Sequence, residues 1–175
     1  MPKAGIPDRI VWAVETLDLK SSDHVLEIGC GHGVAASLVC DKLVRGTLTA
    51  IDRSPKMTAA AEKRNRALID AGKVRFEAVA LADADVGRRR FSKIFAINVN
   101  LFWIDATVEL PVVCKLLRPG GALYLVYEPP SPTQLKPIAA KLARSLEDAG
   151  FIMDRTIAGP KGCLCLIAHA AKETA

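Results

Sequence analysis

Carboxylates and glycines alternate near the N-terminus in a pattern that could hold an extended polar ligand. Glu27 lies within the apolar run 25–28, and Gly29, Gly31 and Gly33 follow at every second position. Positions without a Cβ let a ligand lie against the main chain, and the start of a helix beyond them offers unpaired N–H groups. A carboxylate in an apolar strand is costly without a partner, so Glu27 is a candidate ligand residue. The alternative is a strand-to-helix turn whose glycines serve packing alone.

A second acid ends the next apolar run. Asp52 follows residues 48–51 and stands 19 positions after Gly33. This is close to the spacing of about 20 residues at which an acid reaches a ribose hydroxyl in dinucleotide-binding folds. Two carboxylates at the ends of neighbouring strands, with glycines between them, predict a site for an adenosine-type cofactor. Asp52 is expected to accept hydrogen bonds from both ribose hydroxyls.

These motifs, in this order, resemble those of the class I S-adenosylmethionine-dependent methyltransferases, in a small single-domain bacterial form. The acid-glycine pattern with Asp52 is similar to the family signature, and Leu-Leu-Arg-Pro-Gly-Gly at 116–121 is similar to the entry of its fifth strand. The resemblance covers about 25–169. It implies a methyltransferase enzyme with S-adenosyl-L-methionine as cofactor. It also implies an α/β fold, a Rossmann-like doubly wound sheet of about seven strands in the order 3-2-1-4-5-7-6, with the last strand antiparallel.

The resemblance assigns cofactor contacts to the glycine turn and to the ends of the second, third and fourth strands. The assigned residues are Glu27, Gly29, Cys30, Gly31, Gly33, Asp52, Arg53, Met57, Leu81, Asp83 and Asn98. The acid that often holds the adenine amino group in this family falls on Ala80, so the sequence departs from the pattern there. Asp83, Asp85 or backbone N–H groups are the alternatives. Met57 either lies near the adenine or belongs to the core.

The ends of the fourth and fifth strands are expected to form the acceptor side. Asn100, Phe102, Trp103 and Tyr127 are the predicted substrate contacts, because a few oriented polar groups among aromatic rings are typical of a ligand pocket. Packing of Phe102 and Trp103 beneath the next helix is the alternative. Asn98 and Glu128 are the catalytic candidates, to orient or deprotonate the acceptor. His32 is either a base or a solvent-facing turn residue.

Composition places bounds on the class of protein. The 175 residues fit one methyltransferase domain, 1–175, in which residues 1–20 form an N-terminal helix covering the cleft. No apolar run reaches 18 residues and the N-terminus lacks the apolar core of a signal peptide, which favours a cytoplasmic protein without a membrane partner. The five cysteines favour buried thiols over disulfides, Cys163 and Cys165 sharing one strand face, and no metal-ligand spacing predicts a metal site.

The expected partner is a small-molecule methyl acceptor, because no inserted domain extends the pocket. The net charge of +5 keeps an RNA methyltransferase as an alternative, although the one basic cluster, 88–90, is read as a solvated loop. A cofactor-binding domain without catalysis also remains open, as does the oligomeric state, a homodimer included. A nicotinamide-dependent oxidoreductase is disfavoured, because the third glycine comes two rather than three positions after the second.

Periodicity predicts the elements that position these residues. Helices are expected over 8–17, 34–43, 55–71 and 105–117, and from Pro137 to Gly150. Pro111 should kink its helix or delay its start. Strands are expected over 47–51, 74–80, 91–99 and 122–127, and over 151–157 and 162–169 as a hairpin. Trp12 falls off the apolar stripe of the first helix and is either a partial lid over the cleft or a surface contact.

Overall fold

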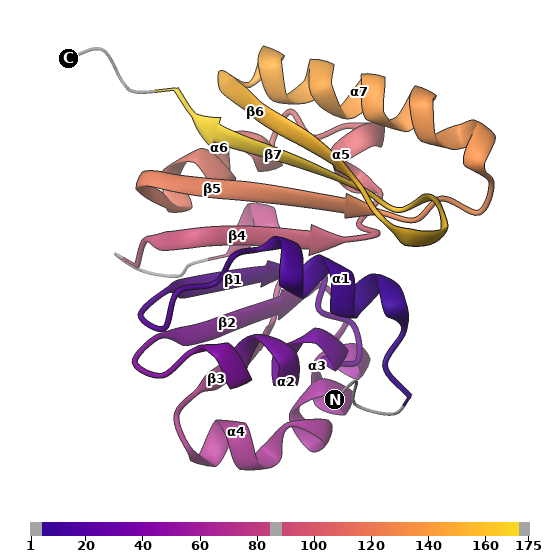
Figure 1. The fold of residues 1–175 in the computed structure, drawn as a ribbon. Coiled ribbons are helices and arrows are strands. Elements are labelled where there is room, and N and C mark those ends of the chain that lie inside the picture. The colour runs from indigo at the N-terminus through magenta and orange to yellow at the C-terminus, as the bar shows by residue number, and fades with distance from the viewer. Residues whose placement is uncertain (1–4, 85–88, 172–175) are drawn as a thin grey trace.

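A mixed sheet of seven strands forms the centre of the computed structural model, which describes residues 5–84 and 89–171 (Figure 1). Its strands are β1 (His24–Ile28), β2 (Thr47–Asp52), β3 (Val74–Ala78), β4 (Phe91–Ile97), β5 (Leu117–Tyr127), β6 (Phe151–Ala158) and β7 (Leu164–Ala170). The order is β3-β2-β1-β4-β5-β7-β6. Neighbouring strands are parallel in the part of the sheet formed by β3, β2, β1, β4 and β5. β7 runs antiparallel to both of its neighbours, β5 and β6. The predicted order and the antiparallel last strand are confirmed.

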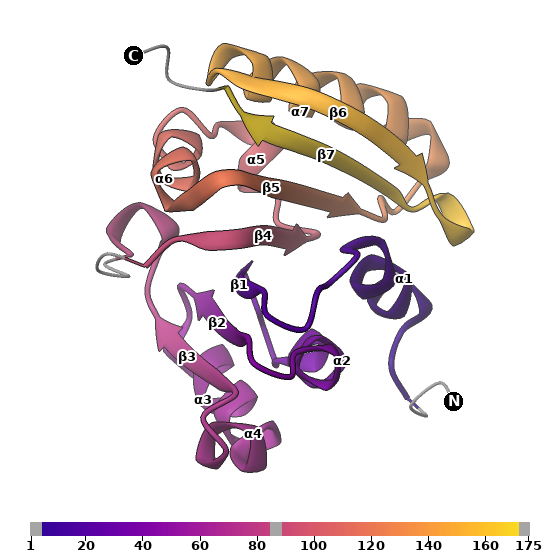
Figure 2. The same ribbon diagram turned by 60° about the vertical axis from the view of Figure 1, so that its left-hand side comes forward.

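Helices cover both faces of the sheet (Figure 2). The sheet separates two apolar clusters, one on each face. One face packs against α1 (Asp8–Thr16), α2 (Val34–Lys42) and α3 (Pro55–Arg64), and the other against α5 (Leu101–Ile104), α6 (Glu109–Leu116) and α7 (Leu135–Asp148). The central strands are therefore apolar on both faces, as Val25 and Leu26, both 0% exposed, illustrate. Within the described ranges, no helix is long and apolar enough to cross a membrane.

The helix predicted over 55–71 is interrupted at Asn65. It forms α3 and the short α4 (Arg66–Asp70) instead. The buried Asn65 side chain donates hydrogen bonds to the carbonyls of Gly33, at 3.0 Å, and Ala61, at 2.9 Å. Since these bonds tie Asn65 to the glycine turn, the break fixes α3 against the start of α2.

Several other boundaries differ from the prediction for local reasons. α6 begins at Glu109, which is the predicted late start, because Pro111 then sits in the first turn, where no intrahelical N–H bond is needed. α7 likewise begins at Leu135, two residues before Pro137. β5 begins at Leu117 rather than at 122, and β3 ends at Ala78 rather than at 80. The hairpin between β6 and β7 is present, with a 3-10 turn, η3 (Pro160–Gly162).

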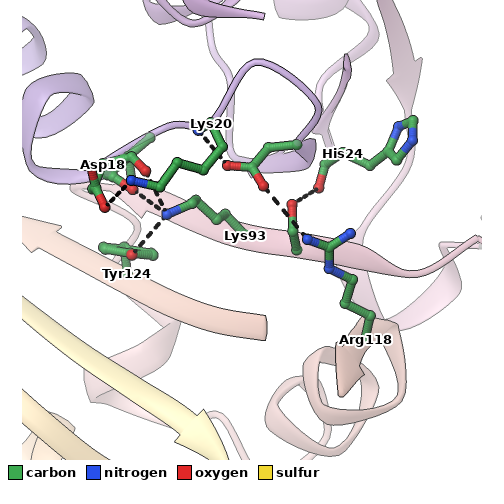
Figure 3. A network of polar contacts seen from close by, with 9 residues as sticks. Asp18, Lys20, His24, Lys93, Arg118 and Tyr124 are labelled. Carbon is green, nitrogen blue, oxygen red and sulfur yellow. Dashed lines mark hydrogen bonds and ion pairs between the residues drawn. The ribbon is translucent and has the colours of Figure 1, made fainter. Parts of the chain in front are cut away.

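Lys93 of β4 joins the end of α1 to the sheet (Figure 3). Its ammonium donates to the carbonyls of Leu17, at 2.6 Å, and Asp18, at 2.9 Å, and to the Tyr124 hydroxyl at 3.3 Å. Asp18 has a left-handed φ of 47°. Partial burial lowers the pKa of Lys93. The lysine thus satisfies two carbonyls that no turn of α1 can satisfy.

Replacing Lys93 with methionine should lower the free energy of unfolding by about 1 to 2 kcal/mol, because the two carbonyls lose a charged donor while the apolar stem is kept. Urea denaturation followed by circular dichroism measures this change. Lys63→Met, at an exposed position of α3, is the matched control and should change stability by no more than about 0.5 kcal/mol. Equal stability of the two variants would show that the Lys93 bonds contribute nothing.

Candidate functional site

The turn between β1 and α2 is held close to the end of β2. The N–H groups of Gly29 and Cys30 both donate to the Ile51 carbonyl, at 2.8 and 3.0 Å. Gly29 has φ +72°, and a Cβ placed on it would stand 2.5 Å from a Val99 methyl group. Gly31 has φ +52°, and a Cβ placed there would meet open space. The turn therefore presents bare main chain at Gly31, where a ligand could lie.

The two glycines make a matched pair for mutation. Gly29→Ala should destabilise the fold by about 1 to 2 kcal/mol, because it combines a clash with Val99 and an unfavourable φ. Gly31→Ala introduces only an unfavourable φ and no clash, so it should lower the free energy of unfolding by about 1 kcal/mol or less. Its methyl group would instead stand in the space in front of the turn. Thermal unfolding separates the two variants, and equal loss of stability would contradict the role of the Val99 contact.

Asp52 is oriented by two backbone amides. Its Oδ2 accepts the Gly31 N–H and its Oδ1 accepts the Ser54 N–H, each at 2.9 Å. A carboxylate oxygen can accept more than one hydrogen bond, so each oxygen keeps a site for a ligand hydroxyl. The same side chain thus links the glycine turn to the start of α3 and faces the cleft.

Glu27 is a buried carboxyl group with an unsatisfied oxygen. It is 4% exposed, and its Oε2 has no hydrogen-bond partner within the described part of the chain. Burial, and secondly the negative charge of Asp52, raise the pKa of Glu27 to about 8. A cationic group of a ligand would supply the missing partner, so this orphaned oxygen fits a cofactor with positively charged atoms.

A cleft of about 690 Å³ opens at the carboxyl ends of the parallel strands. It lies where the strand order reverses, between β1 and β4, which is where open α/β sheets bind ligands. The main chain of Gly29 and the side chains of Asp52 and Asn98 take part in it. The remaining lining residues are Ile28, Ile51, Arg53, Val79, Ala80, Leu81, Ile97, Val99, Asn100, Leu101, Ile104, Asp105 and Glu109.

Six of the predicted site residues line this cleft: Gly29, Asp52, Arg53, Leu81, Asn98 and Asn100. Glu27 is buried and does not line the cleft, and Gly31 donates its N–H to Asp52, which does. Cys30 is buried, and burial raises the pKa of its thiol. His32 is exposed. Asp85, the other candidate for the adenine, lies outside the described residues, as does Arg88 of the basic cluster.

Three predicted cofactor residues are placed differently. A Cβ on Gly33 would stand 2.7 Å from the Asn65 amide and 2.8 Å from the Ala61 Cβ, so this glycine permits close packing of α2 on α3. Met57 is partly buried in the first turn of α3, which Ser54 caps, and does not line the cleft. Asp83 is exposed in the 3-10 turn η1 (Leu81–Asp83) and does not line the cleft either.

The predicted aromatic pocket is not found. Phe102 is 0% exposed in the apolar cluster beneath α5, and Tyr127 is 3% exposed with its hydroxyl donating to the Val99 carbonyl. Trp103 packs toward α7, where the Lys141 ammonium lies 5.6 Å from its ring centroid. The reason is that residues 101–104 form a helical turn, which the sequence analysis did not predict. Leu101 and Ile104 face the cleft instead.

Two acidic residues that line the cleft were not predicted from the sequence. Asp105 and Glu109 follow the turn of α5 and line the cleft. Hydrogen bonds from the Thr107 N–H, at 3.1 Å, and hydroxyl, at 2.8 Å, lower the pKa of Asp105. In the sequence, the feature that could have indicated them is a pair of acids on either side of a helix start after the fourth strand.

The two catalytic candidates are joined by a hydrogen bond. The Glu128 N–H donates to the Asn98 Oδ1 at 2.8 Å, and Asn98 has a left-handed φ of 55°. The Glu128 carboxylate lies 3.1 Å from the Arg9 guanidinium of α1. Glu128 is thus already paired, whereas the Asn98 amide N–H groups have no partner among the described residues and can donate to a ligand.

The N-terminal helix does not cover the cleft as predicted. α1 packs against α2, and Asp8 lies 2.7 Å from the Lys161 ammonium in the β6–β7 hairpin. The Trp12 ring lies against Gly159, where a Cβ would stand 2.5 Å from it, so Trp12 is a packing contact and not a lid. None of the described residues of α1 lines the cleft; Arg9 of α1 pairs with Glu128, whose N–H donates to the lining residue Asn98.

Comparison with known proteins agrees with this geometry. The profile of a family described as "Methyltransferase domain" matches residues 25–121. The Bacillus subtilis protein called "Putative methyltransferase YrhH" is 25% identical over 155 residues, which cover 89% of this chain and 82% of that protein. A trans-aconitate 2-methyltransferase of Rhodococcus jostii is 29% identical over 88% of this chain and 59% of its own length.

The fold has close structural counterparts. The magnesium protoporphyrin IX methyltransferase ChlM of Synechocystis, solved with bound S-adenosylhomocysteine (SAH), superposes with a TM-score of 0.68 at 20% identity. The superposition covers 93% of this chain and 80% of ChlM. At this level of identity, the similarity shows a shared fold.

Proposed function

Because this chain belongs to the class I S-adenosylmethionine-dependent methyltransferases, we propose that it methylates a small-molecule acceptor. The observation that carries the proposal is the cleft of about 690 Å³ at the switch point, which has an amide donor at Asn98 and, among the described residues, no inserted domain around it. The Rhodococcus relative, named for trans-aconitate, is a methyltransferase with a small-molecule acceptor.

The cofactor supplies an activated methyl group on a sulfonium, so the protein mainly has to hold donor and acceptor in line. In the proposal, Asp52 accepts the ribose hydroxyls, and the bare main chain at Gly31 lies along the cofactor. Glu27 pairs with a positively charged atom of the cofactor. Support comes from the two amides that orient Asp52 and from the unsatisfied Glu27 oxygen.

The acceptor side of the proposal rests on the ends of β4 and β5. Asn98 donates an amide N–H to the acceptor or to the cofactor, because its oxygen is already occupied by the Glu128 N–H. Asn100 lies next to it in the cleft lining. Glu128 orients Asn98 and Arg9 rather than serving as a free base, because its carboxylate is ion-paired. Val79 and Leu81 give the adenine an apolar wall, and Glu109 gives it an acceptor in place of the missing acid at Ala80.

Transfer of a labelled methyl group tests the acceptor class. The protein is incubated with methyl-labelled S-adenosylmethionine and a cell extract, which is then separated into small molecules, nucleic acids and proteins. The proposal predicts enzyme-dependent label in the small-molecule fraction. Label confined to nucleic acid would support the RNA methyltransferase instead, and that activity should fall steeply with salt. Cofactor binding with no label in any fraction would favour a non-catalytic domain.

A further inference from the structure

A second pocket, of about 620 Å³, lies at the edge of the sheet opposite the cofactor cleft. It is formed where the parallel strands begin, by His24 at the start of β1, Thr47 and Thr49 of β2, Arg75 of β3 and Phe91 of β4. The cofactor cleft lies at the carboxyl ends of the same strands, so the two sites share no lining residue.

The inner lining of this pocket is apolar. Phe91 is 2% exposed and belongs to one apolar cluster of the sheet, whereas Leu48 and Val74, at most 4% exposed, belong to the cluster of the other face, against which Ile69 of α4 packs. The cationic residues of the lining, Arg89 and Arg90, are exposed. Buried apolar residues with exposed arginines beside them form a pocket with an apolar base and a positively charged opening.

The positive charge of the opening is not balanced by acids of the lining. None of the described residues that line the pocket is acidic. Arg75 is paired with Glu77, two residues further along β3, but Arg89 and Arg90 have no carboxylate partner within the described ranges. Among the described residues, the one side-chain bond of the pair runs from the Arg90 Nη1 to the Arg89 carbonyl, at 3.1 Å. The other guanidinium donors of both residues have no partner in that part of the chain.

We propose that this pocket binds a small phosphate monoester with an apolar body, such as an aryl or nucleoside monophosphate. Guanidinium groups present paired N–H donors that match phosphate oxygens, and the two charges of a phosphate monoester can engage both Arg89 and Arg90. The apolar ring of Phe91, beside Thr47 and Thr49 of β2, would receive the body of the ligand. A pocket of about 620 Å³ lies within the size range of small-molecule sites, whereas a nucleic acid would need a longer basic track.

Binding of phenyl phosphate to the whole protein tests the proposal. The protein is first saturated with SAH, so that the cofactor cleft is filled, and phenyl phosphate is titrated by calorimetry. We expect saturable binding that weakens at least about tenfold in the double variant R89Q/R90Q, because two charged donors are lost. The matched control R64Q/R144Q removes two exposed arginines of α3 and α7 and should leave the affinity unchanged within about twofold.

Titrations with other compounds show which part of the ligand the pocket recognises. Inorganic phosphate and phenol should each bind more weakly than phenyl phosphate, because each offers one half of the ligand, and benzoate should bind more weakly because it carries one charge. Amide shifts in NMR should appear at Val74 and Phe91 and not at Asn98. Affinity for SAH should be the same in R89Q/R90Q as in the wild type, which separates this site from the methyl-transfer site.

Three results would overturn the proposal. They are absence of phenyl phosphate binding at millimolar concentration, equal weakening in R89Q/R90Q and R64Q/R144Q, and binding of benzoate as tightly as phenyl phosphate. The first would show that the pocket holds no such ligand. The second would show general attraction to a basic protein, and the third would show a site for organic anions without preference for phosphate.

Discussion

Replacing Asp52 with alanine should weaken binding of SAH about 10- to 150-fold, which is the energy scale of charge-assisted hydrogen bonds. The loss is large because both carboxylate oxygens are fixed by backbone amides, at 2.9 Å from the Gly31 and Ser54 nitrogens. An oriented carboxylate loses little entropy on accepting the ribose hydroxyls. Isothermal titration with SAH measures the effect.

The Asp52 variant also has a stability cost that must be kept apart from the binding effect. The Gly31 and Ser54 N–H groups lose their acceptor but face the cleft, where water can replace it, so the free energy of unfolding should fall by about 1 kcal/mol. Asp148→Ala, at an exposed position of α7, is the matched control and should leave SAH affinity unchanged. A folded Asp52→Ala protein with wild-type affinity would show that Asp52 does not bind the ribose.

The stability of the cofactor-free protein should fall as the pH rises from about 4.5 to about 8, and Glu27 should account for most of the change. Burial, with the Asp52 charge as a second cause, raises the pKa of Glu27 from 4.5 to about 8. Between these values the folded protein holds a proton that the unfolded chain releases. This group therefore favours folding fully below pH 4.5, and that contribution is lost by pH 8, on the order of 4 kcal/mol.

Glu27→Gln should remove this dependence, because glutamine does not titrate. Urea denaturation at pH 5 and pH 8 should show a much smaller loss of stability in the variant than in the wild type. Glu15→Gln, at an exposed position of α1, is the control and should keep the wild-type dependence. The same pH dependence in Glu27→Gln and the wild type would show that Glu27 is not the titrating group.

Proton release on cofactor binding is a second test of the raised pKa of Glu27. If a cationic group of the ligand pairs with Glu27, the carboxyl group must ionise, so binding near pH 6.5 should release about one proton. Titrations in buffers of different ionisation enthalpy measure that number. Glu27→Gln should release none and should bind SAH more weakly.

Sequence patterns were enough to predict most of the sheet. Strands such as β1 and β2 are short apolar runs, with Glu27 one residue before the end of β1 and Asp52 at the end of β2. Their alternation with helices follows from turn and capping residues such as Ser54 and Pro55. The strand order came from the family resemblance and not from the periodicity. Of the predicted cofactor residues, Gly29 and Asp52, which lie at or just after strand ends, line the cleft.

The acceptor side could not be predicted because its residues are selected by tertiary packing. The order of residues 98–103 does not reveal that 101–104 coil into a turn, and that turn decides that Phe102 enters the core while Leu101 and Ile104 face the cleft. The interruption at Asn65 has the same origin, because its bonds reach Gly33, which is 32 positions away in the chain.

A crystal structure of the protein with SAH tests the account most directly. It should show the ligand at the carboxyl ends of β1, β2 and β4, with the ribose hydroxyls on the Asp52 carboxylate, the α-ammonium group at Glu27 and the sulfur beside Asn98 and Asn100. A ligand bound elsewhere, or a ribose that leaves Asp52 bonded only to the Gly31 and Ser54 amides, would contradict the account.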